Sequence, residues 1–353
     1  MDTVSHGIAG SVLARGLTDR PAARAALLLG LISAMLPDID MFFLHGKIAY
    51  LQGHRGWTHS FFLLPLFALA LALLAKFLYR YSHHVPVRVL FFFAAIGILS
   101  HIVFDWITSF GIMFWIPVSR RRYSLDWVFI LDPFFTGIVS VTLLAATIFR
   151  AKGRLISTIG GAVLLAYVAL CAVLHAAALR AWQRIDNPPP GVKVAVLPQF
   201  LSPFRWLGIS DRVNEIHVAF FDIGPFAKGS PAPRPPERIT QIFSSLSEYY
   251  PPPERARIQS YAKPSPSPVL TAAEKMPDVR AYLDFARFPL ATVRTEPDGA
   301  SVSFQDLRFL PWFSGPWERE RGMRFRRQPF VYRVRLDRSG QPVDRSFVGS
   351  AAD

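Results

Sequence analysis

Residues 89–118 read VLFFFAAIGILSHIVFDWITSFGIMFWIPV, and His101 and Asp105 are the only ionisable side chains among them. The run exceeds the roughly 20 apolar residues that a helix needs to cross a hydrocarbon core about 30 Å thick. It therefore predicts a membrane-spanning helix. Ionisable groups inside such a helix are costly unless they are paired, hydrated or bound to metal, so we expect His101 and Asp105 to have partners.

Three further apolar runs predict spans. They cover residues 57–79, 127–149 and 155–179. Residues 25–37 are too short to cross a bilayer unaided, and Pro37 limits their extension. Residues 3–17 predict a short amphipathic or buried helix without the basic start and cleavage site of a signal peptide, so we expect the N-terminus to be retained. The predicted fold class is an all-α polytopic membrane helical bundle, with four strong spans and a short N-terminal hydrophobic helix, followed by a small α+β soluble domain.

The domain boundary follows from a change in composition. Of the 353 residues, 51% are hydrophobic and only 18% are charged, which disfavours an ordinary water-soluble protein. The long uncharged runs precede residue 180, so we divide the chain into a membrane-embedded helical domain (1–186), a proline-rich α+β soluble domain (187–338) and a tail expected to be disordered (339–353). Within the second domain, residues 192–197, 216–223, 292–304 and 330–336 predict strands, and residues 269–288 predict a helix.

Cysteine content and charge limit the classes of function. Cys171 is the only cysteine, so the chain can hold no internal disulfide or thiolate cluster, and any metal must be bound by His, Asp or Glu. The formal net charge of +14 suggests contact with anionic lipid headgroups or nucleic acid, although a membrane protein also acquires flanking Lys and Arg for its topology alone. Because no DNA-reading motif is recognisable, we expect the membrane lipid bilayer, and not nucleic acid, as the partner. The sequence identifies no protein partner.

Acidic and imidazole side chains meet at one face if successive apolar segments alternate in direction. They include Asp38, Asp40, His54, His59, His101 and Asp105. The sharpest local signal is His101-Ile-Val-Phe-Asp105, because an i to i+4 spacing places both side chains on one helix face. The pair suits a shared divalent cation, and it equally suits a buried hydrogen bond that joins two helices.

Two other segments add candidate ligands. Pro37-Asp38-Ile39-Asp40 places two carboxylates after a helix end, where a cation would relieve the negative potential; the alternative is a solvated turn. Gly53-His54-Arg55-Gly56-Trp57-Thr58-His59-Ser60 supplies two imidazoles, and the planar fork of Arg55 suits a phosphate or carboxylate. Alternatively, these are interfacial residues and a charge that sets topology. His6 alone is more typical of a structural hydrogen bond.

Three remaining polar features have simpler interpretations. Asp132 precedes Pro133 and predicts a helix N-cap. Arg120, Arg121 and Arg122 suit anionic headgroups or a substrate phosphate, and they equally suit a flanking anchor. We expect His175 to pack within the bundle.

The order of these motifs resembles one family, the YdjM-like, LexA-binding inner-membrane-associated hydrolases, also described as membrane-bound metal-dependent hydrolases. The matching segments are Ser5-His6-Gly7, Leu36-Pro37-Asp38-Ile39-Asp40, His54 through Ser60, and Ser100 through Asp105 with Thr108-Ser109-Phe110-Gly111. They cover roughly the first half of the chain. The resemblance implies a multi-pass protein of the bacterial inner (cytoplasmic) membrane whose His and Asp residues bind metal. It names no substrate.

A more distant similarity links these motifs to zinc-dependent phospholipase C and single-strand nucleases, which are helical and hydrolyse phosphodiesters. Those enzymes combine an early His, an Asp, further His residues and a His-x-x-x-Asp helix pair. This chain has no evident second helix of that kind, so one or two metal ions fit better than three. Zinc is the favoured divalent metal, with Mn or Fe as alternatives.

The resulting hypothesis is a membrane-bound metal-dependent hydrolase of a lipid or lipid-linked phosphoester. The predicted metal ligands are His6, Asp38, His54, His101 and Asp105. Asp40 and His59 are predicted to move protons, and Arg55 to stabilise developing negative charge. The alternative is a non-enzymatic membrane protein, either a metal or proton transporter or a partner-binding scaffold. The Lys and Arg bias balances between the two membrane sides unless Arg55 and the Arg120–Arg122 cluster serve the site, which would place the site on the extracytoplasmic face.

Overall fold

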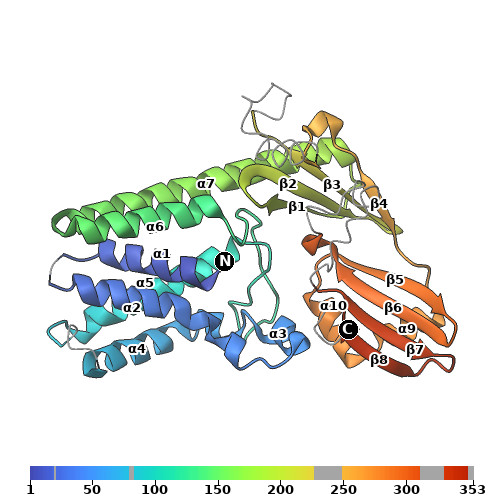
Figure 1. The fold of residues 1–353 in the computed structure, drawn as a ribbon, viewed down its shortest axis with the longest axis horizontal. Coiled ribbons are helices and arrows are strands. Elements are labelled where there is room, and N and C mark those ends of the chain that lie inside the picture. The colour runs from blue at the N-terminus through green and yellow to red at the C-terminus, as the bar shows by residue number, and fades with distance from the viewer. Residues whose placement is uncertain (20, 79–82, 226–248, 311–329, 349–353) are drawn as a thin grey trace, which may run out of the picture. The chain divides into compact units, whose positions relative to one another are not determined.

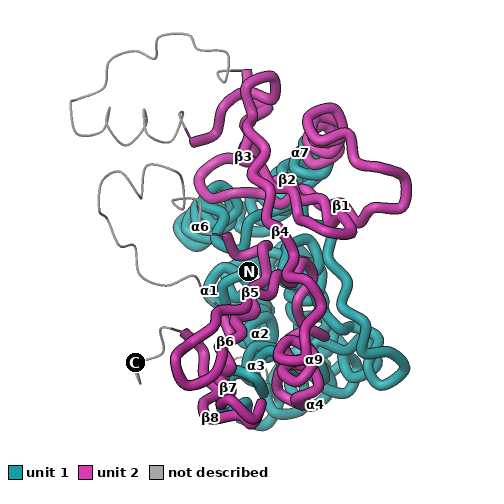
Figure 2. The backbone as a smooth tube through the Cα atoms, turned by 90° about the vertical axis from the view of Figure 1, so that its right-hand side faces the viewer, with its two compact units in different colours: residues 1–174 teal, residues 175–353 magenta. Residues whose placement is uncertain are grey.

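The computed structural model describes residues 1–353 apart from 20, 79–82, 226–248, 311–329 and 349–353. The chain divides into two compact units, Met1–Leu174 and His175–Asp353 (Figure 2). The N-terminal region is helical, and the C-terminal region contains two antiparallel sheets. The sequence therefore predicts the succession of a helical part and a strand-rich part correctly.

Seven α-helices with connecting 3₁₀ turns build the described N-terminal region (Figure 1). They are α1 (Thr3–Gly16), α2 (Ala23–Met35), α3 (Lys47–Gly53), α4 (Leu64–Leu78), α5 (Val87–Trp106), α6 (Pro133–Ile148) and α7 (Gly153–Asp186), with the turns η1 (Leu36–Phe42), η2 (Trp57–His59) and η4 (Arg150–Lys152). Asp132 accepts the backbone N–H groups of Phe134 and Phe135, each at 2.9 Å, which confirms its predicted capping role.

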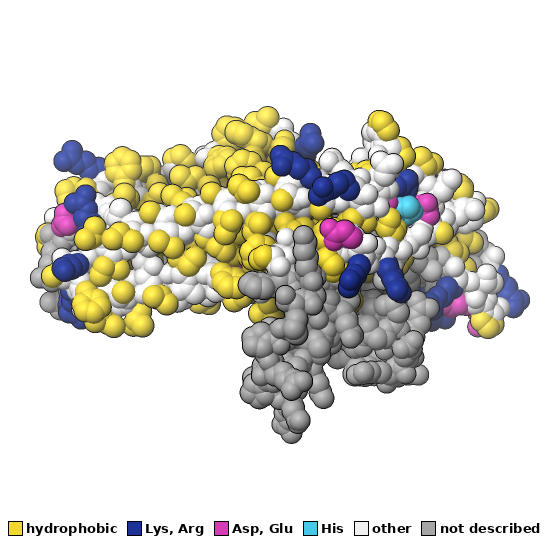
Figure 3. Space-filling model, turned by 90° about the horizontal axis from the view of Figure 1, so that it is seen from above, with side chains coloured by type: hydrophobic (Ala, Val, Ile, Leu, Met, Phe, Trp, Pro, Cys, Tyr) yellow, Lys and Arg dark blue, Asp and Glu magenta, His cyan; other side chains and the backbone are white. Residues whose placement is uncertain are grey.

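Three helical segments among the described residues are long and apolar enough to cross a membrane: Ala23–Phe42, Val87–Trp106 and Arg150–Asp186. Lys47–His59 and Leu64–Leu78, bent by 71°, form a fourth if they cross together. Only 17% of the apolar window of Arg150–Asp186 is buried inside the protein, so most of that surface needs hydrocarbon around it. Figure 3 shows the apolar side chains of this face and the Lys and Arg side chains gathered at its end.

The bounds of the spans differ from those expected. Residues 25–37 were expected to be too short, but η1 continues α2 and makes a candidate span of 20 residues. The run 89–118 is helical only to Trp106 and continues as turns and loop, in which Gly111 takes a left-handed φ of +89°. The run 127–149 yields α6 with 16 residues, and the run 57–79 yields η2 and α4, with residue 79 outside the described residues.

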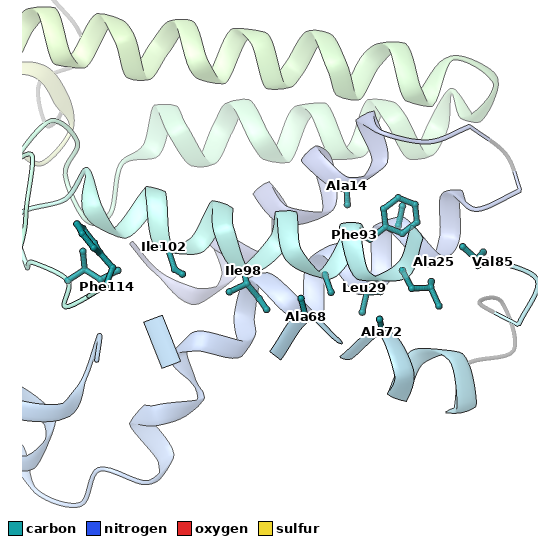
Figure 4. Close-up of a cluster of buried hydrophobic side chains, with 14 residues drawn as sticks. Ala14, Ala25, Leu29, Ala68, Ala72, Val85, Phe93, Ile98, Ile102 and Phe114 are labelled. Atoms are coloured by element: carbon teal, nitrogen blue, oxygen red, sulfur yellow. The ribbon is translucent and has the colours of Figure 1, made fainter. Parts of the chain in front are cut away.

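Glycines let α1, α2 and α5 approach closely. A Cβ at Gly10 would overlap the backbone carbonyl of Gly30, and one at Gly97 would overlap the Ser33 hydroxyl. The apolar core beside this crossing joins α1, α2, α4 and α5, with Ala14, Leu29, Ala72 and others shown in Figure 4. Close backbone contact thus fixes α5, which carries His101 and Asp105, against α2, which leads into Asp38.

The described C-terminal region has two four-stranded sheets. One contains β1 (Lys193–Gln199), β2 (Ser202–Asp211), β3 (Glu215–Asp222) and β4 (Gln259–Ala262), and the other β5 (Pro289–Glu296), β6 (Gly299–Asp306), β7 (Tyr332–Asp337) and β8 (Pro342–Phe347). The helices are α9 (Pro268–Glu274) and α10 (Pro277–Phe285). The end of α7 is tied to the first sheet, since Asp186 lies 2.6 Å from His217 Nδ1 and 3.0 Å from an Arg212 nitrogen.

Two elements of this region differ from the expected ones, and both differences arise at proline. The expected strand 292–304 is a hairpin, with Glu296 paired to Gly299 across a Pro-Asp turn. The expected helix 269–288 is divided at Pro277, which has no backbone N–H to continue α9. Part of the tail that was expected to be disordered forms β8, and residues 349–353 lie outside the described residues.

Candidate metal centre

Four side chains from three elements converge in the helical region. Asp38 comes from η1, His59 from η2, and His101 and Asp105 from α5. One ligand atom of each lies within 4.8 Å of the others, and all four residues are buried. The group consists only of His and Asp, as predicted for a chain whose single cysteine cannot build a thiolate site.

The local sequence explains how η1 presents carboxylates inward. Pro37 lies in the first turn of the 3₁₀ segment, and Asp38 and Asp40 are buried while Ile39 and Met41 are 42% and 40% exposed. The segment therefore has one acidic face and one apolar face. The Thr3 hydroxyl of α1 donates to Asp38 Oδ2, which leaves Asp38 Oδ1 toward the group, 3.4 Å from His101 Nε2.

Asp40 organises the loop between α3 and η2. Its Oδ1 lies 2.8 Å from His54 Nδ1, and its Oδ2 accepts the backbone N–H of Arg55 (3.2 Å) and the hydroxyl of Thr58 (3.0 Å). Arg55 has a left-handed φ of +61°, which turns the chain so that His59 reaches the group. A guanidinium nitrogen of Arg122 donates to the carbonyls of Leu51 and His54 at 2.7 and 3.1 Å, so the segment after α5 also holds this loop.

Hydrogen bonds select the same tautomer for both imidazoles of the group. His101 Nδ1 lies 2.6 Å from the Ala34 carbonyl oxygen, which only accepts, so Nδ1 carries the proton of the neutral ring. His59 Nδ1 lies 2.9 Å from Thr58 Oγ1, whose own proton goes to Asp40, so His59 also donates from Nδ1. Both Nε2 atoms are then lone-pair donors, and they face each other at 3.0 Å.

This convergence fits a divalent cation. Two lone-pair nitrogens and two carboxylate oxygens repel one another in a buried site unless a positive charge lies between them. Asp105 Oδ2 has no hydrogen-bond donor among the described residues, and it lies 3.4 Å from both Nε2 atoms. Bonds of about 2.0–2.1 Å in a tetrahedral zinc site separate ligand atoms by roughly 3.4 Å. In the four-residue group, the Nε2 atoms of the imidazoles lie 3.4 to 3.8 Å from the carboxylate oxygens.

The other oxygen of Asp105 faces a cluster of donors. Arg55 lies 2.8 Å and His6 Nε2 3.0 Å from Asp105 Oδ1, and the Met1 amine also contacts it. Arg55 is only 2% exposed; it also donates to Thr108 Oγ1 at 3.1 Å and lies over the Phe110 ring. His6 stacks on His101 with ring centroids 3.8 Å apart. Asp105 thus connects the four-residue group to Arg55 and His6.

Half of the predicted site residues lie in the four-residue group, and the other half lie around it. Asp38, His101 and Asp105, predicted as ligands, lie in the group together with His59, which was predicted to move protons. Of the remaining residues, His6 and Arg55 contact Asp105, while His54 and Asp40 contact each other.

Several residues that hydrogen-bond to the site residues were not predicted from the sequence. Thr58, Thr3, Thr108 and the carbonyl of Ala34 were not predicted to support the site. Thr58 and Thr108 lie inside the quoted motifs, which is a usable signal, whereas a backbone carbonyl leaves none in the sequence.

Comparison with known proteins gives the following matches. Residues 1–181, which contain the whole candidate site, match the family described as "YdjM inner membrane protein". The chain is similar to Inner membrane protein YbcI of Escherichia coli (strain K12), with 30% identity over 128 residues, 35% of this chain and 72% of that protein. It is similar to Uncharacterized protein YfhP of Bacillus subtilis (strain 168), with 25% identity over 142 residues, 38% of this chain and 42% of that protein. No solved structure matches the chain.

Proposed function

The chain belongs to the YdjM inner membrane protein family, and from this premise we propose that it is a membrane-bound metal-dependent hydrolase that cleaves a phosphoester of a membrane lipid. The observation that carries the proposal is the buried convergence of Asp38, His59, His101 and Asp105, with lone pairs directed at one point. A buried set of this kind is costly to maintain without a ligand.

The four-residue group would hold the metal, and zinc suits its nitrogen and oxygen donors. A divalent metal bound there would supply Lewis-acid activation of water and of a phosphoryl oxygen. His6 donates from Nε2 to Asp105, so its Nδ1, which has no partner among the described residues, is a base able to take a proton. Arg55 has an Nε–H without an acceptor among the described residues, and this cation is suited to an anionic substrate group.

Metal analysis and a hydrolysis assay on the detergent-purified full chain test the proposal. The variant Asp38→Ala/His101→Ala removes two ligands, and His45→Ala, at an exposed position, is the matched control. We expect stoichiometric metal and phosphoester hydrolysis in the wild type and in the control, and loss of both in the double variant, with folding checked by circular dichroism.

Two other results would contradict the proposal. Unchanged hydrolysis in a folded double variant would exclude the site. Metal binding without hydrolysis of any lipid phosphoester, combined with metal flux across sealed vesicles, would indicate a transporter.

A further inference from the structure

A groove on the helical region lies between α2, α4 and the beginning of α5. It encloses about 290 Å³ and is lined by Ala25, Leu28, Leu29, Ile32, Leu71, Leu74, Ala75, Leu78 and Leu90. All nine of these described residues are Ala, Leu or Ile. In Figure 4, Ala25 and Leu29 of α2 lie near Ala72 of α4 at one end of the adjoining core.

The groove leads toward the metal centre along α2. Exposed apolar side chains follow one face of α2 and continue onto η1, at Leu28, Ile32, Met35 and Ile39. Their spacing of four, three and four residues is that of a single helical face. Ile32 lines the groove and lies about 10 Å along the segment from Asp38. Ala34, two residues beyond Ile32, holds His101 through its carbonyl.

The lining and the volume of the groove indicate which class of molecule binds in it. An all-aliphatic surface on membrane-spanning segments offers nothing to a headgroup, ion or polar peptide. A transmembrane helix of a second copy, about 10–12 Å across, would fill the enclosed volume with less than one turn. A flexible hydrocarbon chain fits both the volume and the apolar lining. At the other end of this path, the Arg55 guanidinium and the cation that the four-residue group would hold are complementary to an anionic phosphoester.

We propose that the groove between α2 and α4 binds a hydrocarbon tail of the lipid substrate while its phosphoester reaches the metal centre. This inference rests on the proposed function and specifies its substrate as a long-chain amphiphile in preference to a free, water-soluble phosphoester. The tail enters from the bilayer beside α4, and η1 guides the lipid between the groove and the site.

The test compares two neighbouring residues of α4 that receive the same substitution. Leu74 lines the groove and Leu73 does not, although both side chains are exposed. Leu74→Trp fills the groove, and Leu73→Trp adds the same bulk to the lipid-facing surface beside it. The probe is phosphatidic acid with a photoreactive diazirine in a palmitoyl chain, cross-linked to the full chain in detergent and mapped by mass spectrometry.

We expect cross-links on the groove segments 25–32 and 71–78, reduced roughly tenfold in Leu74→Trp because displacing two methylene groups has about that effect, and unchanged in Leu73→Trp. In parallel, hydrolysis of dipalmitoyl phosphatidic acid should fall in Leu74→Trp, whereas hydrolysis of the dibutyryl form should not. Equal cross-linking in the two variants would overturn the groove assignment. Groove cross-links that depend on Leu74, without hydrolysis of either lipid, would support the tail site and reject the hydrolase.

Discussion

Replacing Thr58 by valine should weaken metal binding although every donor atom of the four-residue group remains. Thr58 Oγ1 accepts from His59 Nδ1 at 2.9 Å and donates to Asp40 Oδ2 at 3.0 Å. Valine keeps the shape of threonine and makes neither hydrogen bond. The Nδ1–H tautomer of His59 then loses its support, and the ring becomes free to place its proton on Nε2, where the metal would bind.

The size of the effect follows from the bonds removed. Two hydrogen bonds with a net value of about 0.5–1.5 kcal/mol each amount to roughly 1–3 kcal/mol. Loss of an outer partner of a metal-binding histidine typically lowers metal affinity by about 10–100-fold, which is the same range. We therefore expect the dissociation constant for Zn²⁺ to rise by about one to two orders of magnitude in Thr58→Val.

Competition with a chromophoric chelator, on the full chain in detergent, measures this change. Thr58→Ser is the control, because serine keeps both hydrogen bonds and loses only a methyl group. Thermal unfolding of the metal-free proteins shows whether each variant is folded. Wild-type affinity in a folded Thr58→Val would refute the tautomer assignment, and an equal loss in Thr58→Ser would show that packing, not hydrogen bonding, is responsible.

Three further predictions concern stability. Asp105→Asn leaves the buried Arg55 guanidinium without its carboxylate, so the free energy of unfolding in denaturant should fall by about 3–5 kcal/mol; a loss below about 1 kcal/mol would contradict the buried ion pair. Gly97→Ala should cost about 1–3 kcal/mol through overlap at the α2–α5 crossing, whereas Gly137→Ala, which meets open space inside α6, should not lower the melting temperature, because alanine has the higher helix propensity. Removing metal with a chelator should lower the free energy of unfolding by about 2.7 kcal/mol relative to protein at a metal concentration of 100 times Kd. The Asp38→Ala/His101→Ala variant, which lacks two of the four ligands, should show no change in its free energy of unfolding on addition of the chelator.

The apolar runs in the sequence predicted the location of the helices more accurately than the residues at which the helices begin and end. The length of 89–118 indicated a span, but the helix ends at Trp106 and the rest of the run is not helical. Pro37 was taken as a terminator, although proline is compatible with the first turn of the 3₁₀ segment that follows. The hairpin at Glu296 could have been expected, because Pro297-Asp298-Gly299 is a turn sequence.

The site was predictable in its composition and only partly in its arrangement. Carboxylates and imidazoles in apolar segments identify His101 and Asp105 from sequence, because their spacing alone puts them on one helix face. The five-residue spacing of His54 and His59 does not reveal which ring turns inward, since this depends on the left-handed Arg55 between them. Long-range partners such as the Ala34 carbonyl follow only from the fold.

The two faces of η1 make the thickness of the bilayer relevant to the chemistry of the site. Ile39, Met41 and the 76% exposed Phe42 need hydrocarbon or the membrane interface around them, while Asp38 on the opposite face needs to stay buried with the other candidate ligands. Because the same short segment meets both needs, a bilayer that is too thin or too thick must tilt α2 or expose these side chains, at a cost of fractions of a kcal/mol per Å of mismatch. The resulting strain acts on the segment that holds Asp38. The acyl-chain length of the host membrane therefore influences the position of Asp38 relative to the other candidate ligands.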